Sequence, residues 1–309
     1  RLSDATLERA ARDYDVVINH DDQPCTAEQL IAASAEFDAI IPCHSEHFSA
    51  DVVARFLNRL KIVANHSVGV DHCNLPALKG RSIAVTNTPD VLSDATAELA
   101  MLLMLGTARH AVAGDRTVRT GVWDSWSPAF MVGKQVTGAR LGIIGMGRVG
   151  RAFTAKARGF DMKVHYYNRS ELSADQANGA IYHNTIESLL RVADFLSLHC
   201  PATPETTDLM NAHRLALLPQ GAVIVNTARG ALVDEDALIA AIETGQVTAA
   251  GLDCYKTEPG GNAAFAAYEN IFMLPHIGSA TRQTRDAMGF RALDNLDAFF
   301  AGKTPRDLL

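Results

Sequence analysis

Cysteine is scarce in this chain and follows no pattern. The 309 residues include five cysteines, an odd number without any Cys-x-x-Cys pair. That distribution excludes a disulfide-dense secreted scaffold and the usual zinc spacings. We therefore expect free thiols, no metal site and a reducing compartment, namely the cytoplasm.

Long apolar runs and a basic surface are also missing. The most apolar stretch, residues 97–105, contains Glu98, and it is far shorter than the about 18 residues that a membrane helix needs. The N-terminus shows no basic segment followed by an apolar one, as a signal peptide would. The net charge of −7 gives no electrostatic footprint for DNA or RNA. We expect neither a membrane nor a nucleic-acid partner.

The chain does have the composition of a globular protein, with 48% apolar and 20% charged residues. Its length suffices for two domains, because one core seldom serves more than about 250–300 residues. A turn at residues 88–90 and a long final helix mark the division. We expect a substrate-binding domain formed by residues 1–91 and 281–309, and a dinucleotide-binding domain formed by residues 92–280.

Short apolar runs alternate with helix-like stretches in both regions, which predicts parallel sheets covered on both faces. Strands are expected at residues 15–19, 37–42, 60–65 and 82–87, and then at 140–144, 163–167, 195–199, 222–226, 248–253 and 271–274. The fold class is therefore α/β, with two doubly wound parallel-sheet domains, a Rossmann domain and a smaller flavodoxin-like one. Because the chain opens on a helix-like stretch, we expect a first strand of the smaller sheet to lie outside this sequence.

A glycine-rich turn follows the first strand of the larger region. The sequence Gly145-Met146-Gly147-Arg148-Val149-Gly150 lies between the apolar run 141–144 and a helix-like run. The first glycine permits a tight turn, the second lets the backbone approach a pyrophosphate, and the third lets helix and strand pack closely. The N-terminus of the new helix would face the phosphates. The motif predicts a dinucleotide cofactor.

The end of the next strand indicates which dinucleotide binds. An NAD-type site has an acidic residue about 20 positions after the motif, where it accepts hydrogen bonds from ribose hydroxyls. Here that place is taken by Asn168-Arg169-Ser170. A guanidinium beside a hydroxyl suits a 2′-phosphate, which a carboxylate would repel. We predict a preference for NADP(H).

Three charged or titratable residues follow later strands of the same region, namely Arg229, Glu258 and His276. All three should lie along the carboxyl edge of the sheet. Arginine can clamp a carboxylate and polarise the neighbouring carbonyl. Histidine can protonate a carbonyl oxygen as hydride reaches the carbon, and a carboxylate beside it favours the imidazolium. The set suits the reduction of a 2-oxo acid.

The smaller region offers one further candidate, the loop at residues 65–72. It follows a strand, and Gly69 would let backbone N–H groups face an anion. A plain turn explains the same residues equally well.

Together these motifs resemble the D-isomer-specific 2-hydroxyacid dehydrogenase family over essentially the whole chain. The resemblance rests on the glycine motif and on the segments at 226–230, 251–253, 258–259 and 274–278. It implies that Arg229, Glu258 and His276 bind substrate and catalyse, and that the backbone at Val68 and Gly69 holds the substrate carboxylate. By the same resemblance, the cofactor is lined by Thr96, the glycine motif, Asn168, Arg169, Ser170, His199, Cys200, Pro201, Thr206, Thr227, Ala228, Asp253, His276 and Gly278.

Within the family, the ending at 168–170 resembles NADPH-dependent glyoxylate and hydroxypyruvate reductases. The expected activity is reduction of these small 2-oxo acids to 2-hydroxy acids, with His276 as general acid. Two alternatives stay open: a reductase of bulkier acids such as phenylpyruvate, and a dinucleotide-sensing scaffold protein. The resemblance also implies a homodimer, in which Trp126, from a loop that also holds Trp123, lines the partner's substrate pocket.

Overall fold

The computed structural model describes residues 2–309. The chain forms two compact units, one of residues 1–92 with 279–309 and one of residues 93–278. Each unit is an α/β structure built on its own parallel sheet. The α/β fold class expected from the sequence is confirmed.

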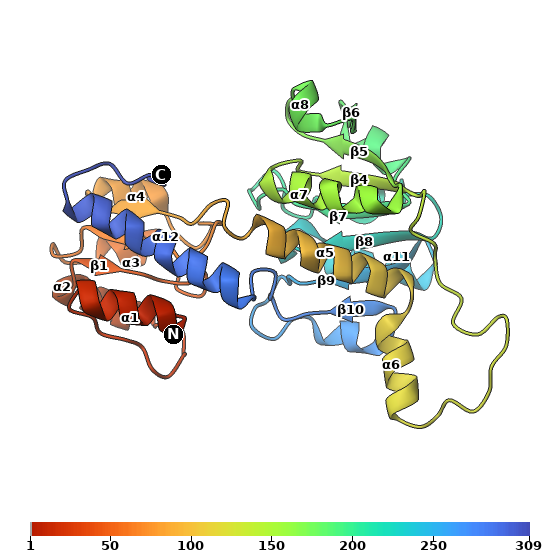
Figure 1. The fold of residues 1–309 in the computed structure, drawn as a ribbon, viewed down its shortest axis with the longest axis horizontal. Helices are drawn as coiled ribbons and strands as arrows, with labels where there is room; N and C mark the ends of the chain where they lie inside the picture. Colours follow the sequence, from red (N-terminus) through yellow and green to blue (C-terminus); the bar gives the residue numbers. More distant parts are fainter. Residues whose placement is uncertain (1) are drawn as a thin grey trace. The chain divides into compact units, whose positions relative to one another are not determined.

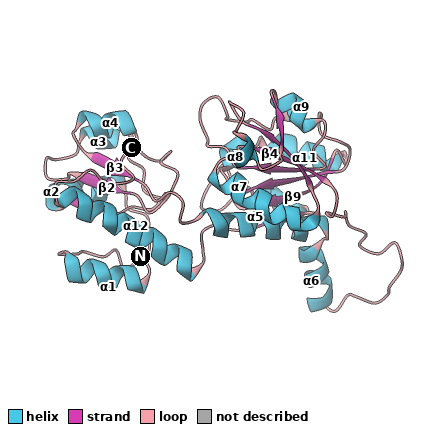
Figure 2. Ribbon diagram, turned by 45° about the horizontal axis from the view of Figure 1, so that its top comes forward, coloured by secondary structure: helices cyan, strands magenta, loops and turns pink. Residues whose placement is uncertain are grey.

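The larger unit contains a seven-stranded sheet in the order β10-β9-β8-β7-β4-β5-β6, and every neighbouring pair is parallel. Its strands are β4 (Arg140–Ile144), β5 (Lys163–Tyr167), β6 (Ile181–His183), β7 (Phe195–Leu198), β8 (Ala222–Asn226), β9 (Val247–Leu252) and β10 (Ile271–Met273). Its helices, drawn in cyan in Figure 2, are α5 (Ser93–Ala108), α6 (Ala111–Arg119), α7 (Arg148–Ala157), α8 (Ala174–Ala177), α9 (Ile186–Leu190), α10 (Ala212–Leu215) and α11 (Glu235–Glu243).

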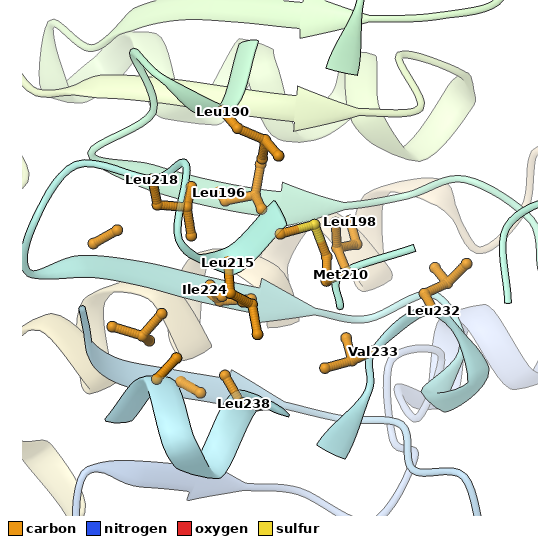
Figure 3. Packing of buried hydrophobic residues seen from close by; sticks show 14 of the residues in the cluster. Leu190, Leu196, Leu198, Met210, Leu215, Leu218, Ile224, Leu232, Val233 and Leu238 are labelled. Atoms are coloured by element: carbon orange, nitrogen blue, oxygen red, sulfur yellow. The ribbon is translucent and has the colours of Figure 1, made fainter. Parts of the chain in front are cut away.

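The central strands β7 and β8 are buried on both faces along their whole length, which explains why they are almost continuous apolar runs. Successive strand side chains alternate between the faces, so Val223 and Val225 of β8 join the cluster under α5 and α7, whereas Ile224 joins the opposite cluster. That second cluster lies under α9, α10 and α11, and Figure 3 shows Ile224 there beside Leu215 and Leu238.

The smaller unit has a three-stranded parallel sheet in the order β1-β2-β3, formed by β1 (Ala39–Ile40), β2 (Ile62–Ala64) and β3 (Ala84–Thr86). Its helices are α1 (Asp4–Asp13), α2 (Ala27–Glu36), α3 (Ala50–Ala54), α4 (Leu75–Gly80) and α12 (Arg282–Phe300). The central strand again alternates, because Ile62 and Ala64 pack with α1 and α12, while Val63 packs with α2, α3 and α4. The last helix therefore completes the core of the first segment of the chain.

Side-chain caps fix several helix starts where the sequence suggests them. The Asp234 carboxylate accepts a hydrogen bond from the Ala237 N–H at the start of α11. Ser49 caps α3 in the same way, and Thr281 caps α12. Each cap satisfies an N–H group that the helix itself leaves unpaired.

Two expectations about strands are wrong. Residues 15–19 pair with no strand, and Val17 is 74% exposed, because an apolar alternation makes a strand only where a neighbour supplies hydrogen bonds. The larger sheet also has seven strands where six were expected. The missed strand, β6, has three residues and lies at the sheet edge.

All five cysteines are free thiols, as the sequence predicts. Among residues 2–309, no helix combines the length and the apolar character needed to cross a bilayer.

Candidate active site of the larger unit

The order of the strands selects one place in the larger sheet. The chain runs from β4 to β5 and β6 on one side, then crosses over to β7 on the other side of β4. Loops leaving β4 and β7 diverge there, and open α/β sheets bind ligands at such a switch point. The glycine motif follows β4, and His199, Cys200 and Pro201 follow β7, so these candidates meet at the switch point.

The backbone of the two loops is in close contact. A Cβ added at Gly145 would lie 2.5 Å from the backbone nitrogen of Cys200, and Gly145 has a φ of 97°. A Cβ at Gly150 would lie 2.5 Å from the carbonyl oxygen of Gly145. At Gly147, in contrast, an added Cβ would meet no atom within 4 Å. The outer glycines are therefore needed for packing, whereas the middle one faces open space before the start of α7, as a phosphate cradle requires.

The loop after β5 carries Asn168, Arg169 and Ser170. The Asn168 Oδ1 accepts a hydrogen bond of 2.7 Å from the Met146 N–H, which ties this loop to the glycine turn. With that oxygen turned toward Met146, the side-chain NH₂ is available as a donor to a ligand. Arg169 and Ser170 are exposed, and Arg169 forms no ion pair within the described part of the chain.

Two tyrosines that sequence reasoning missed hold this loop. The hydroxyl of Tyr166, which is fully buried, accepts from the Leu172 N–H at 3.0 Å. The hydroxyl of Tyr182 donates to the Asn168 carbonyl oxygen at 3.4 Å. A tyrosine in a buried strand is interpreted as part of the core, so nothing in the sequence indicated that these two hydroxyls hold the loop.

The remaining cofactor candidates lie at the same edge. The Thr227 hydroxyl, just after β8, is buried and has no hydrogen-bond partner within residues 2–309, as expected of a group that a ligand completes. His199 donates to or accepts from Ser197 at 2.9 Å, and burial lowers its pKa to about 4. Burial raises the pKa of the Cys200 thiol to about 11. Both groups are therefore uncharged at neutral pH, beside Pro201; Thr206 in the next turn donates to the Pro201 carbonyl oxygen.

His276 and Glu258 are in direct contact at the carboxyl edge of the larger sheet. The Nδ1 of His276 lies 2.6 Å from Glu258 Oε2, and the other oxygen of Glu258 accepts from the Tyr255 N–H at 2.8 Å. Both side chains are about a quarter exposed, at 26% and 23%. His276 has a φ of 53°, a backbone conformation that is uncommon outside glycine and that recurs at functional sites. The carboxylate thus fixes the tautomer and orientation of the ring.

Asp253 supports the segment that carries His276. Its two oxygens accept from the Ile277 and Gly278 N–H groups, both at 2.8 Å. Burial raises the pKa of the Asp253 carboxyl, while these two N–H groups and the nearby His276 oppose that shift. Gly278 packs directly on Asp253 and on Thr96 of α5, another cofactor candidate. Asp253 is thus a support behind the histidine as well as a candidate ligand of the cofactor.

Arg229 lies at the same edge because the next residue, Gly230, packs closely against the backbone of Tyr255. A Cβ on Gly230 would lie 1.8 Å from the carbonyl carbon of Tyr255, so only glycine lets the Arg229 loop lie against the turn leading to Glu258. The Asn226 side chain accepts from the Ala228 N–H and donates to the Arg229 carbonyl oxygen. The Arg229 guanidinium itself donates to the Ala228 carbonyl oxygen at 2.7 Å.

The other three expected substrate residues come from other segments of the chain. Val68 and Gly69 belong to the smaller unit, in the loop after β2. Trp126 lies in the extended segment after α6 and is 74% exposed, and Trp123 in the same segment is 56% exposed. Figure 1 shows this segment and α6 extending away from the sheet of the larger unit. Within the described residues, neither tryptophan packs on another aromatic ring.

Comparison with known proteins fits this geometry. The sequence model of "D-isomer specific 2-hydroxyacid dehydrogenase, NAD binding domain" matches residues 101–278. The chain is 40% identical to a glycerate dehydrogenase of Hyphomicrobium methylovorum, over 97% of this chain and 94% of the relative. It belongs to the D-isomer-specific 2-hydroxyacid dehydrogenase family.

Other members of this family carry related names. A glyoxylate reductase of Pyrococcus horikoshii is 39% identical over 96% of this chain and 90% of its own length. Among solved structures, an NADPH-dependent glyoxylate/hydroxypyruvate reductase of Sinorhizobium meliloti, in complex with NADP and malonate, superposes with a TM-score of 0.87 at 30% identity. That match covers 100% of this chain and 94% of the other. This 2-hydroxyacid dehydrogenase therefore binds a nicotinamide dinucleotide, as its glycine motif predicts.

The open space at Gly147 yields a prediction for the cofactor site. In Gly147→Ala the added methyl meets no protein atom, so thermal stability should stay near that of the wild type. The same methyl occupies the side from which a pyrophosphate approaches, so the dissociation constant for NADPH should rise at least about tenfold, the equivalent of 1.4 kcal/mol.

The matched control is Gly159→Ala, since a Cβ at Gly159 also meets no atom within 4 Å. This variant should keep both stability and affinity, as measured by thermal unfolding and by quenching of tryptophan fluorescence on titration with NADPH. Unchanged NADPH binding by Gly147→Ala would contradict the assignment of this turn.

Proposed function

We propose that this dehydrogenase reduces small 2-oxo acids, glyoxylate and hydroxypyruvate, to the corresponding 2-hydroxy acids with NADPH. The observation that carries the proposal is the His276–Glu258 contact of 2.6 Å at the carboxyl edge of the dinucleotide-binding sheet. One relative is named for glyoxylate and another for glycerate, whose 2-oxo form is hydroxypyruvate.

The side chains divide the reaction as follows. The nicotinamide, when bound, supplies the hydride. Arg229 pairs with the substrate carboxylate and polarises the adjacent carbonyl. Glu258 holds Nδ1 of His276, so we assign the proton donated to the carbonyl oxygen to Nε2 of the same ring. After the transfer, His276 regains a proton from solvent.

The contribution of His276 can be measured separately from cofactor binding. His276→Asn keeps a polar side chain but removes the transferable proton, so kcat should fall by about 10²–10⁴-fold while the affinity for NADPH stays close to that of the wild type. His213→Asn, at an exposed histidine of α10, is the control and should keep full activity. A near-normal kcat in His276→Asn would remove this residue as the acid.

The preference for NADPH is proposed from the loop after β5. The NH₂ of Asn168, the guanidinium of Arg169 and the Ser170 hydroxyl can all donate, and residues 168–170 include no carboxylate to accept from ribose hydroxyls. Such a set favours a 2′-phosphate over a 2′-hydroxyl.

Arg169→Asp should therefore lower the ratio of kcat/KM for NADPH to that for NADH by about 10–100-fold, the value of one or two charge-assisted hydrogen bonds. Arg191→Asp reverses an exposed charge near α9 of the same unit and should leave the ratio unchanged. Equal use of both cofactors by the wild type, or an unchanged ratio in Arg169→Asp, would contradict the proposed preference.

We also propose a homodimer in the cytoplasm. Exposed apolar residues recur along α5, α6 and the segment that follows α6, namely Leu102, Val112, Val118, Val122, Trp123, Trp126, Phe130 and Val132. Exposed apolar residues in such numbers mark an interaction surface, and by resemblance to the family its partner is a second copy whose substrate pocket Trp126 completes.

Light scattering at micromolar concentration should accordingly report twice the 33.2 kDa of one chain. Val118→Asp with Phe130→Asp should shift the mass toward the monomer, because a charge buried in an apolar interface is costly. A monomeric wild type would contradict the proposed dimer.

A further inference from the structure

The loop after β2 has its carbonyl groups held from inside the smaller unit. The Asn87 Nδ2 donates to the Val68 carbonyl oxygen at 2.9 Å. The Ser67 hydroxyl donates to the Gly69 carbonyl oxygen at 2.8 Å, and the Thr88 N–H donates to the Ser67 carbonyl oxygen at 2.9 Å. Three consecutive carbonyls are therefore engaged.

These contacts decide where the N–H groups of the loop face. In a trans peptide the C=O and N–H groups point in opposite directions, and the peptide bonds here are trans. With the Val68 carbonyl held by Asn87, the Gly69 N–H must face away from Asn87. Because the Ser67 hydroxyl holds the Gly69 carbonyl, the Val70 N–H must likewise face away from Ser67. Neither N–H donates to an acceptor within residues 2–309, and residues 68–70 are half-buried. Adjacent free N–H groups of this kind form an anion-binding concavity.

Asn87 is itself fixed by a buried network that includes the C-terminal segment. The Asn295 Nδ2 donates to the Asn87 carbonyl oxygen at 3.2 Å and to Asp307 Oδ2 at 3.1 Å. Arg291 pairs with both oxygens of Asp307. Asn295 is 1% exposed and Asp307 8%, so these hydrogen bonds lie in a low dielectric and are costly to break. The network fixes the Asn87 backbone, from which the side chain reaches the Val68 carbonyl oxygen.

We propose that Asn87 is a positioning residue for the substrate carboxylate, because it orients the Gly69 N–H through the Val68 carbonyl. This inference rests on the proposed function and on the resemblance to the family, which implies that the backbone at Val68 and Gly69 holds that carboxylate. The side chain of Asn87 touches the peptide, and the peptide touches the substrate.

The test uses the full chain with Asn87→Ala. Removing one hydrogen bond should let the peptide rotate, so the KM for glyoxylate should rise about tenfold. The inhibition constant of oxamate, an unreactive carboxylate analogue, should rise by a similar factor. Because the carboxylate is bound in both ground and transition states, kcat should change little, and the affinity for NADPH should not change.

Asn74→Ala is the matched control. Its side chain accepts from the Ala77 N–H at the start of α4 in the same unit, so its loss should lower the melting temperature without raising either constant. Should Asn87→Ala fail to fold, Ser67→Ala provides the second variant. It releases the Gly69 carbonyl by removing one hydroxyl, and it should raise both constants in the same direction.

The outcomes are distinguishable. A rise in KM and in the oxamate constant, with kcat and NADPH affinity retained, supports the inference. An active wild type whose variants keep both constants, or lose kcat and NADPH affinity equally, would overturn the inference alone. A wild type that binds NADPH but neither reduces glyoxylate nor responds to oxamate would overturn the proposed function and this inference together.

Discussion

The hydrogen bond between Nδ1 of His276 and Glu258 is the contact around which the rest of the site is arranged. Neither residue is near the other in sequence, and each follows a different strand, β10 and β9. Their meeting requires the parallel register of these two strands, in which Met273 pairs with Leu252. The Tyr255 hydroxyl holds the two strand ends together by donating to the Leu252 and Leu274 carbonyl oxygens. The packing of the sheet therefore determines where the proton donor lies.

Support behind the histidine matters as much as the pair itself. Asp253 has its charge buried and holds the Ile277 and Gly278 N–H groups, which fixes the segment where His276 has a positive φ. Gly230 allows the Arg229 loop to touch the same turn. A strained backbone of this kind persists only where its surroundings determine it fully. In the smaller unit, Asn87 and Ser67 support the loop after β2 in a similar way. Their side chains hold the Val68 and Gly69 carbonyl oxygens and so fix the orientation of two peptide groups.

Much of this could be read from the sequence, because the signals were local. The central strands β7 and β8 of the larger sheet are apolar runs buried on both faces, and in a parallel sheet the residues that follow the strands share one edge. Strand β6 was missed because a strand of three residues at the sheet edge, one exposed and two half-buried, carries little pattern. Residues 15–19 were wrongly predicted as a strand because an apolar run does not show whether a neighbouring strand is there to pair with it. The roles of Tyr166, Tyr182 and Asn87 were not predictable, since each depends on a hydrogen bond between a side chain and a distant backbone group.

The most direct test of the account is the loss of nicotinamide absorbance with purified protein, with NADPH and NADH run side by side. Glyoxylate, hydroxypyruvate, pyruvate and phenylpyruvate are the substrates to compare by kcat/KM. The account predicts rapid oxidation of NADPH, well above that of NADH, with the first two acids. Turnover of phenylpyruvate in place of these acids would contradict the proposed substrate, and bound NADPH without turnover of any 2-oxo acid would contradict the role given to Arg229, Glu258 and His276.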